Sequence, residues 1–132
     1  MASIFTRIIR RELPGYIVAE TDSCIAFLDV NPMVEGHTLC VPKREVDYYY
    51  DLPPEELTEL TLFSQRVAQG LKEAIQCRRI ANGVLGLEVP HVHVHLVPVQ
   101  TTQDFRFGKQ VTVSSNRMEE LRDRIAAAIP KG

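Results

Sequence analysis

Cysteines are few in this sequence and long hydrophobic runs are missing, and these two absences exclude several classes of protein. The 132-residue chain has three widely spaced cysteines, Cys24, Cys40 and Cys77, and the first two lie in apolar sequence. An odd number at such spacing is typical of buried free thiols and not of a disulfide framework or a cysteine-based zinc cluster. Because no apolar run approaches a membrane span and the first residues lack a signal-peptide layout, we expect a cytoplasmic protein with no membrane partner.

A strong charge of either sign and the common phosphate-binding motifs are also missing. The formal net charge is −2, which gives no reason to expect a nucleic acid as partner but is compatible with a small phosphorylated ligand. Neither GxGxxG nor GxxxxGK[ST] occurs, so the usual glycine-rich phosphate cradles are absent from the sequence. The length and a hydrophobic fraction of 45% predict a single domain over residues 1–132 with its own core.

The spacing of apolar residues predicts an α+β fold. The expected helices are 3–13, about 54–76, and a C-terminal helix that starts with a capping box at Asn116 and Glu119 and ends near Pro130. The expected strands are 16–20, 24–29, 37–42, 78–87 and 91–98, and 101–113 is expected to be loop with at most a short strand at 110–113. Short turns between successive strands favour an antiparallel meander sheet of about five strands over a parallel doubly wound sheet.

Three of the four histidines alternate with apolar side chains in HVHVHLVP, residues 91–98. This period of two predicts a strand with one buried face, so the three imidazoles should point the same way. With a rise of about 3.3 Å per residue, neighbouring imidazoles lie about 6.6 Å apart and the outer two about 13 Å apart. Two adjacent members could share a zinc ion, whereas all three could not without a sharp bend.

The chemistry of imidazole indicates what such a strand could do. An unprotonated imidazole is a nucleophile that can carry phosphorus covalently, because water easily displaces the P–N bond. His93, in the middle, is best placed for attack, and its neighbours can donate hydrogen bonds to phosphate oxygens. One nitrogen of the nucleophile must be held as a donor so that the other presents its lone pair. The residues therefore indicate phosphoryl or nucleotidyl transfer that needs neither a metal nor a cofactor.

Several sequence blocks, in the right order, resemble the histidine triad (HIT) family of nucleotide hydrolases and transferases. Residues 91–97 match HφHφHφφ, and residues 4–14 are similar to the N-terminal IFxKIIxxEIP. Residues 26–32 and 36–43 resemble AFxDIxP and GHxLVIPK. The chain looks most like the Hint-like branch, whose members are homodimeric purine nucleoside phosphoramidases and nucleotide hydrolases. The resemblance thus implies a purine nucleotide as ligand and a second copy of the chain as partner.

The resemblance also implies a role for each matched residue. His93 would attack the α-phosphorus to give a nucleotidyl-histidine, with His91 and His95 flanking the phosphate. His37 would support the cluster through a hydrogen bond, and Asp29, eight residues earlier, would accept bonds from the ribose hydroxyls. The base pocket would be lined by apolar residues: Phe5, Ile8, Phe27, Val30 and Leu39.

The segment before the triad departs from the family pattern. The family usually has Gly-Gln-x-Val-x-His, whereas residues 86–91 read GLEVPH, so Leu87 cannot make the polar contact to phosphate. An ionised Glu88 near a phosphate would be repulsive. We therefore expect Glu88 either to turn outward or, in its protonated form, to give a proton to the leaving group, and Asn82 is a candidate for the missing polar contact.

Two alternatives stay open at the level of sequence. In the first, two of the strand histidines and His37 hold a catalytic zinc ion, since three histidines can suffice for such a site. In the second, the protein is a nucleotide-binding sensor or scaffold with little turnover, which the missing glutamine favours.

Overall fold

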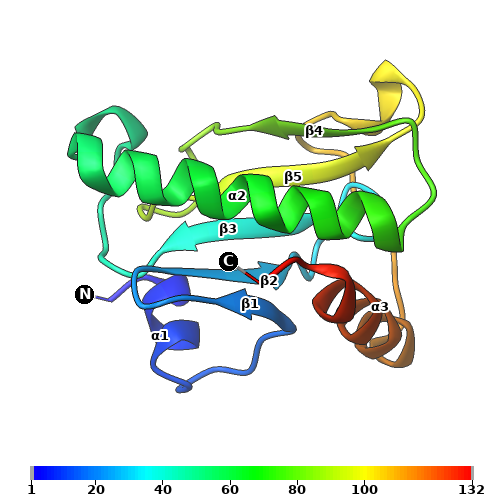
Figure 1. Ribbon diagram of the computed structural model, residues 1–132, viewed down its shortest axis with the longest axis horizontal. Coiled ribbons are helices and arrows are strands. Elements are labelled where there is room, and N and C mark those ends of the chain that lie inside the picture. The colour runs from blue at the N-terminus through cyan, green and yellow to red at the C-terminus, as the bar shows by residue number, and fades with distance from the viewer. Residues whose placement is uncertain (1, 132) are drawn as a thin grey trace.

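The computed structural model describes residues 2–131, and within them five strands form one antiparallel sheet against which the helices pack (Figure 1). The strands are β1 (Ile17–Glu20), β2 (Cys24–Leu28), β3 (Thr38–Pro42), β4 (Arg79–Gly83) and β5 (Val94–Val99), and the helices are α1 (Ile4–Ile9), α2 (Pro54–Ala74) and α3 (Ser115–Ala128). Two short 3₁₀ turns, Tyr49–Asp51 and Thr102–Asp104, complete the elements of this part of the chain. The strand order is β1-β2-β3-β5-β4, which confirms the predicted α+β fold.

The long helix α2 begins where the sequence places two prolines. Pro54 occupies the first turn, whose backbone N–H groups need no partner within the helix, and Glu55 and Glu56 lie at the positive end of the helix dipole. The buried side of α2 packs over β3 and β5 and contacts α3. Where α3 ends, a Cβ at Gly70 would lie 2.5 Å from the backbone of Ile129, so glycine permits this close approach.

The two faces of the sheet carry different apolar clusters, because successive side chains of a strand point to opposite faces. On one face the sheet packs with α2 and α3; the sheet residues of this cluster include Cys24, Ala26, Leu28, Cys40, Val94 and Leu96. On the other face α1 packs against β2 and β3; this second cluster is Phe5, Ile8, Ile25, Phe27, Leu39 and Val41. Cys24 and Cys40 are buried free thiols, as expected, and Cys77 is half-buried. The second face is the one that carries the histidines.

The strand β5 begins three residues later than the sequence pattern predicts. Its pairing with β3 ends at the Cys40–Val94 pair, so His91 and His93 precede the strand. The backbone N–H of Val92 instead bonds the carbonyl oxygen of Val46, in the loop that follows β3. The prediction of one continuous histidine strand was therefore wrong at its start.

Other boundaries also differ from the prediction. The first helix, expected over 3–13, spans only Ile4–Ile9, and Arg11 beyond its end has φ +63°, which is not helical. The strand expected over 78–87 ends at Gly83, and residues 110–113 form no strand but include a bond from the Val111 N–H to the Pro32 carbonyl oxygen. Helix α3 is capped by Ser114, whose hydroxyl accepts from the N–H of Arg117, so the predicted capping box at Asn116 was wrong. Within residues 2–131, no helix combines the length and apolar character needed to cross a membrane.

Candidate active site

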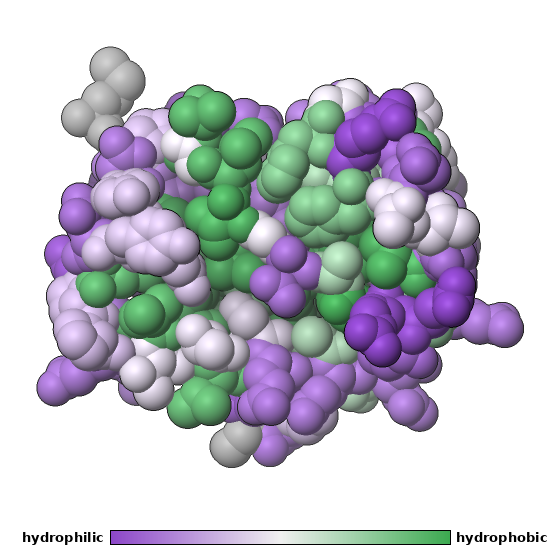
Figure 2. All heavy atoms as spheres, turned by 90° about the horizontal axis from the view of Figure 1, so that it is seen from above, coloured by the Kyte–Doolittle hydropathy of each residue, from purple (hydrophilic) through white to green (hydrophobic). Residues whose placement is uncertain are grey.

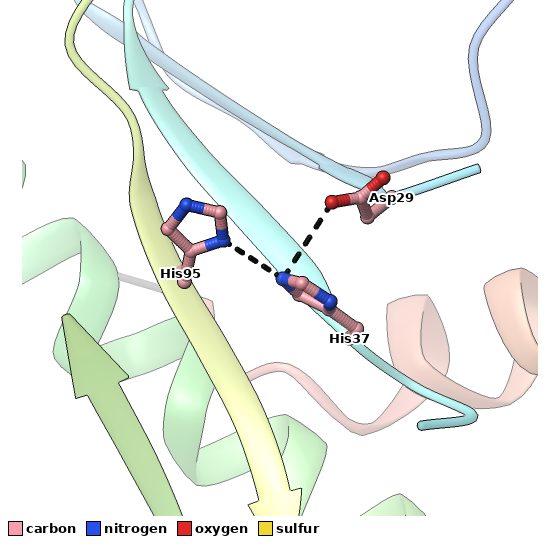
Figure 3. Close-up of side chains that lie close together, drawn as sticks. All are labelled: Asp29, His37 and His95. Atoms are coloured by element: carbon pink, nitrogen blue, oxygen red, sulfur yellow. Dashed lines mark hydrogen bonds and ion pairs between the residues drawn. The ribbon is translucent and has the colours of Figure 1, made fainter. Parts of the chain in front are cut away.

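The imidazole of His37 is held in one tautomer by a turn before β3. Gly36 in this turn has φ +92°, a conformation that favours glycine. The Nδ1 atom of His37 accepts a hydrogen bond from the backbone N–H of Met33 at 2.9 Å. Burial lowers the pKa of His37 to about 3. Because the neutral ring has one proton, that proton is on Nε2, which donates to Nδ1 of His95 at 2.9 Å (Figure 3).

His95, on β5, continues this relay into the candidate site. Burial, with a further contribution from the adjacent His93, lowers the pKa of His95 to about 4, so this ring is also neutral near pH 7. Since its Nδ1 accepts from His37, its proton is on Nε2. That Nε2 is buried and has no hydrogen-bond partner among residues 2–131. A buried N–H without a partner is costly, and here it offers a donor to a bound ligand.

His93 presents a nitrogen of the opposite character. Its Nδ1 lies 2.8 Å from the backbone oxygen of His91. A carbonyl oxygen only accepts, so Nδ1 carries the proton, and in the neutral ring the lone pair is on Nε2. The ring lies edge-on to Phe5 and to His95, with centroid distances of 4.9 Å and 5.0 Å. A nucleophilic nitrogen and a free N–H donor thus belong to adjacent imidazoles.

Both ring nitrogens of His91 are occupied within the protein. Nε2 lies 2.7 Å from the backbone oxygen of Pro42, and Nδ1 lies 2.7 Å from the hydroxyl of Ser3. The side chain is fully buried. Burial lowers the pKa of His91, against smaller opposing effects of the Pro42 carbonyl and Glu45. These bonds do not fit the expectation that the His91 ring flanks the phosphate; it is placed to orient its neighbours.

Asp29 follows β2 and brings a carboxylate to the same cluster. Its Oδ1 accepts from the backbone N–H of Asn31 at 2.9 Å, and its Oδ2 lies 3.6 Å from Nε2 of His37 (Figure 3). Burial raises the pKa of Asp29, and the nearby charge of Glu88 raises it further. Asp29, His37, His95 and Glu88 all line one cavity of about 190 Å³. The structure therefore brings these four predicted site residues together.

The loop after β5 supplies residues that the sequence pattern does not mark. The ring of Phe107 lies edge-on to His95 at a centroid distance of 5.0 Å. Lys109 and Gln110 line the same cavity as Asp29. Apart from its polar composition the loop has no motif or hydrophobic period, so no signal in the sequence selects these three residues.

Asn82 and Val30 do not join the cluster. Asn82 on β4 pairs with Leu96 and lines a separate hollow beside α2. Paired residues in an antiparallel ladder share a face, so Asn82 lies on the face opposite to His95 and cannot supply the missing contact. Val30 is 67% exposed, whereas the other residues proposed for the base pocket form the closed cluster beneath α1; these are Phe5, Ile8, Phe27 and Leu39.

Among residues 2–131, one group of side chains meets the distance requirement for a metal site. One donor atom from each of Asp29, His37 and His95 lies within 4.8 Å of the others. The hydrogen bonds argue against this use. A metal on Nε2 of His37 would force the ring proton onto Nδ1, toward the N–H of Met33 that already donates there. His37 and His95 are instead joined by a hydrogen bond, and Asp29 lies 3.6 Å from the same Nε2 of His37, an arrangement that does not leave that nitrogen free for a metal.

The antiparallel sheet carries two hydrogen-bonded, buried imidazoles, His37 and His95, next to the unprotonated nitrogen of His93. This arrangement is the one expected for a protein of the histidine triad class, and comparison with known proteins gives the same class. A family model described as the HIT domain matches residues 10–102, so the chain belongs to the HIT family. Adenosine 5′-monophosphoramidase HNT1 of Saccharomyces cerevisiae is 39% identical over 98 residues, which are 74% of this chain and 62% of that protein. An uncharacterized HIT-like protein of Methanocaldococcus jannaschii is 37% identical over 99 residues, 72% of this chain and 77% of its own length.

Solved structures share the fold. The crystal structure of a Hit-like protein from Bartonella henselae has a TM-score of 0.84 at 30% identity and covers 96% of this chain and 95% of its own. A hypothetical histidine triad nucleotide-binding protein of Sulfolobus tokodaii has a TM-score of 0.81 at 29% identity, with 95% and 90% covered.

Proposed function

We propose that the protein is a nucleotide hydrolase that cleaves the α-phosphate bond of a purine nucleoside 5′-phosphoramidate or a related nucleotide through a nucleotidyl-histidine. The observation that carries this proposal is the lone pair on Nε2 of His93 beside the free, buried Nε2–H of His95. The substrate class is supported by the name of the yeast relative, an adenosine 5′-monophosphoramidase.

The proposed reaction has two displacements at the α-phosphorus. Nε2 of His93 forms a bond to phosphorus while the P–N bond of the substrate breaks, and the leaving amine takes up a proton. Water then attacks the nucleotidyl-histidine, and the products are a nucleoside monophosphate and the free imidazole. In both steps Nε2–H of His95 donates to a non-bridging oxygen, where negative charge must be tolerated.

The nucleoside is proposed to bind at the Asp29 end of the cavity. A carboxylate can accept both hydroxyls of a ribose diol, and one Asp29 oxygen already has a backbone partner that fixes the group. Val30, exposed beside it, offers apolar surface to the base. Lys109 contributes the only cation that lines this cavity within residues 2–131 and would offset phosphate charge.

A second copy of the chain is the proposed partner, as the family resemblance implies. β4 is an edge strand with β5 as its one neighbour in the sheet of the described residues, and such an edge can pair with another chain. Figure 2 shows the molecule from above the view of Figure 1, on the side where β4 lies. Hydrophobic residues gather over much of the surface in that view. Light scattering should give about twice the 14.9 kDa of one chain.

The covalent step can be tested directly. We expect a denaturing quench at alkaline pH, at which the P–N bond of a nucleotidyl-histidine survives, to trap the adduct during turnover of adenosine 5′-phosphoramidate, and peptide mass spectrometry should locate it at His93. His93→Ala should lose both the adduct and the turnover, whereas the surface variant Glu59→Gln should keep both. Turnover by His93→Ala at the parent rate would contradict the proposal. Binding of the nucleotide without turnover by the parent protein would instead favour the sensor alternative.

A further inference from the structure

Glu45, in the loop after β3, holds the first turn of α1. Its Oε1 accepts hydrogen bonds from the hydroxyl of Thr6 at 2.6 Å and from the backbone N–H of Ser3 at 2.7 Å. These bonds, with that from Thr6 the largest cause, lower the pKa of Glu45 to about 2, so the group is ionised at neutral pH. An ionised carboxylate only accepts, which forces the Thr6 hydroxyl to be a donor.

The direction of the Thr6 bond fixes the direction of the next one. Thr6 gives its hydroxyl hydrogen to Glu45, so the hydrogen of the Ser3 hydroxyl is directed to Nδ1 of His91. The Ser3 hydroxyl oxygen lies 2.7 Å from that nitrogen and 3.3 Å from the Thr6 hydroxyl oxygen. The Ser3 oxygen in turn accepts from the backbone N–H of Thr6 at 3.1 Å. The ring of His91 is thus an acceptor at Nδ1 and a donor at Nε2, where Pro42 receives the bond.

The side chain of His91 fixes the backbone at a point that the hydrogen bonds between β3 and β5 do not reach. The pairing of β5 with β3 stops at Val94, and around His91 the backbone bonds go to the loop residues Val89 and Val46. Yet the backbone oxygen of His91 is the atom that receives the Nδ1–H of His93 and so aims the attacking nitrogen. In place of ladder bonds, the two ring bonds of His91 fix this part of the backbone.

We propose that Glu45 is a positioning residue for His93. The Pro42 carbonyl oxygen holds the proton of His91 on Nε2. Glu45 acts through Ser3 and Thr6 on the orientation of His91, and through the His91 backbone oxygen on the attacking nitrogen of His93. Glu45 does not line the cavity that holds Asp29 and His95, so it is placed to act through other residues. The catalytic consequence rests on the proposed function, whereas the orientation of His91 does not.

Two measurements test the proposal on the 132-residue chain. Long-range ¹H–¹⁵N NMR of the histidine side chains reports which ring nitrogen carries the proton. We expect the parent to show His91 as the Nε2–H tautomer, and Glu45→Ala to shift the ¹⁵N signal of His91 Nδ1, because the hydrogen bond from the Ser3 hydroxyl to that atom is weakened. In the same variant, kcat for adenosine 5′-phosphoramidate should fall about 10- to 100-fold because the nucleophile is misplaced, with KM little changed.

Further variants separate positioning from folding. Glu45→Gln keeps an oxygen that can accept both bonds and should retain the parent ¹⁵N shift of His91 Nδ1, whereas Thr6→Val, similar in shape, should change that shift. Glu59→Gln is the matched control, because Glu59 accepts a 2.7 Å bond from the Ser23 hydroxyl elsewhere on the surface. Unchanged ¹⁵N shifts of His91 and His93 in Glu45→Ala would overturn the proposal, as would equal loss in Glu45→Gln. Failure of the parent to turn over substrate would overturn only the proposed function.

Discussion

The ring of His93 is tied to the backbone of the histidine two residues before it, since its Nδ1 donates to the carbonyl oxygen of His91 over 2.8 Å. The orienting group of the proposed nucleophile is therefore a main-chain oxygen and not a carboxylate. A main-chain acceptor holds the ring proton on Nδ1 without placing a negative charge beside the incoming phosphate.

Replacing His95 with leucine should remove the free donor of the site. We expect His95→Leu to lower kcat for adenosine 5′-phosphoramidate by about 100-fold, similar to the loss of one oxyanion-hole donor. The nucleotidyl adduct on His93 should form more slowly in rapid-quench experiments. Circular dichroism should show that the variant is folded, and an unchanged rate of adduct formation in a folded variant would contradict the role of His95.

Asp29 should determine how the protein discriminates ribose from deoxyribose. If the carboxylate accepts the ribose hydroxyls, the parent should favour the ribonucleoside substrate over its 2′-deoxy analogue. Asp29→Ala should lower kcat/KM for the ribonucleoside about 10- to 100-fold, the effect of one lost charge-assisted hydrogen bond, and should change the deoxy substrate much less. Equal losses on both substrates would place the function of Asp29 elsewhere.

Glu88 lines the same cavity as Asp29, so it does not simply turn away from the site. We expect Glu88→Gln to slow cleavage of substrates whose leaving amine is strongly basic and needs a proton. Substrates with a good leaving group should be cleaved at nearly the parent rate. If kcat is unchanged for every leaving group across such a series, Glu88 is not the proton donor.

The buried histidines should make the fold sensitive to moderate acid. Burial lowers the pKa values of His37 and His95 to about 3 and about 4, whereas in the unfolded chain both take up protons near pH 6.5. The unfolded state then binds more protons below that pH, so the free energy of unfolding falls as the pH falls, by up to about 1.4 kcal/mol per pH unit for each histidine.

Urea denaturation between about pH 7 and about pH 4.5 measures this slope. His37→Asn should unfold with a shallower dependence on pH than the parent, even if it is less stable at every pH. A parent protein whose stability is constant over this range would contradict the neutral state assigned to the two rings.

The sequence by itself predicted the class of the fold, which the structure confirms, and a set of candidate site residues. Short apolar runs next to turn residues indicate β2 and β3, and alternation of histidine with apolar side chains indicates most of β5. The two prolines and the acidic first turn indicate the start of α2, because these signals too are local. The HVHVHLVP run indicated the histidine site before any geometry was known, and the family resemblance, with the eight-residue spacing of Asp29 and His37, added those two residues to it.

The tertiary structure decided the division of roles among the histidines. Which nitrogen carries the proton depends on partners remote in sequence, such as Ser3 and Pro42 for His91, and sequence spacing contains no information on them. The register of β4 against β5 likewise excluded Asn82, because one step along a strand changes the face. The three alternating histidines therefore differ in character, because each ring has a different set of hydrogen-bond partners. His91 orients its neighbour, His93 presents a lone pair, and His95 presents a free N–H donor.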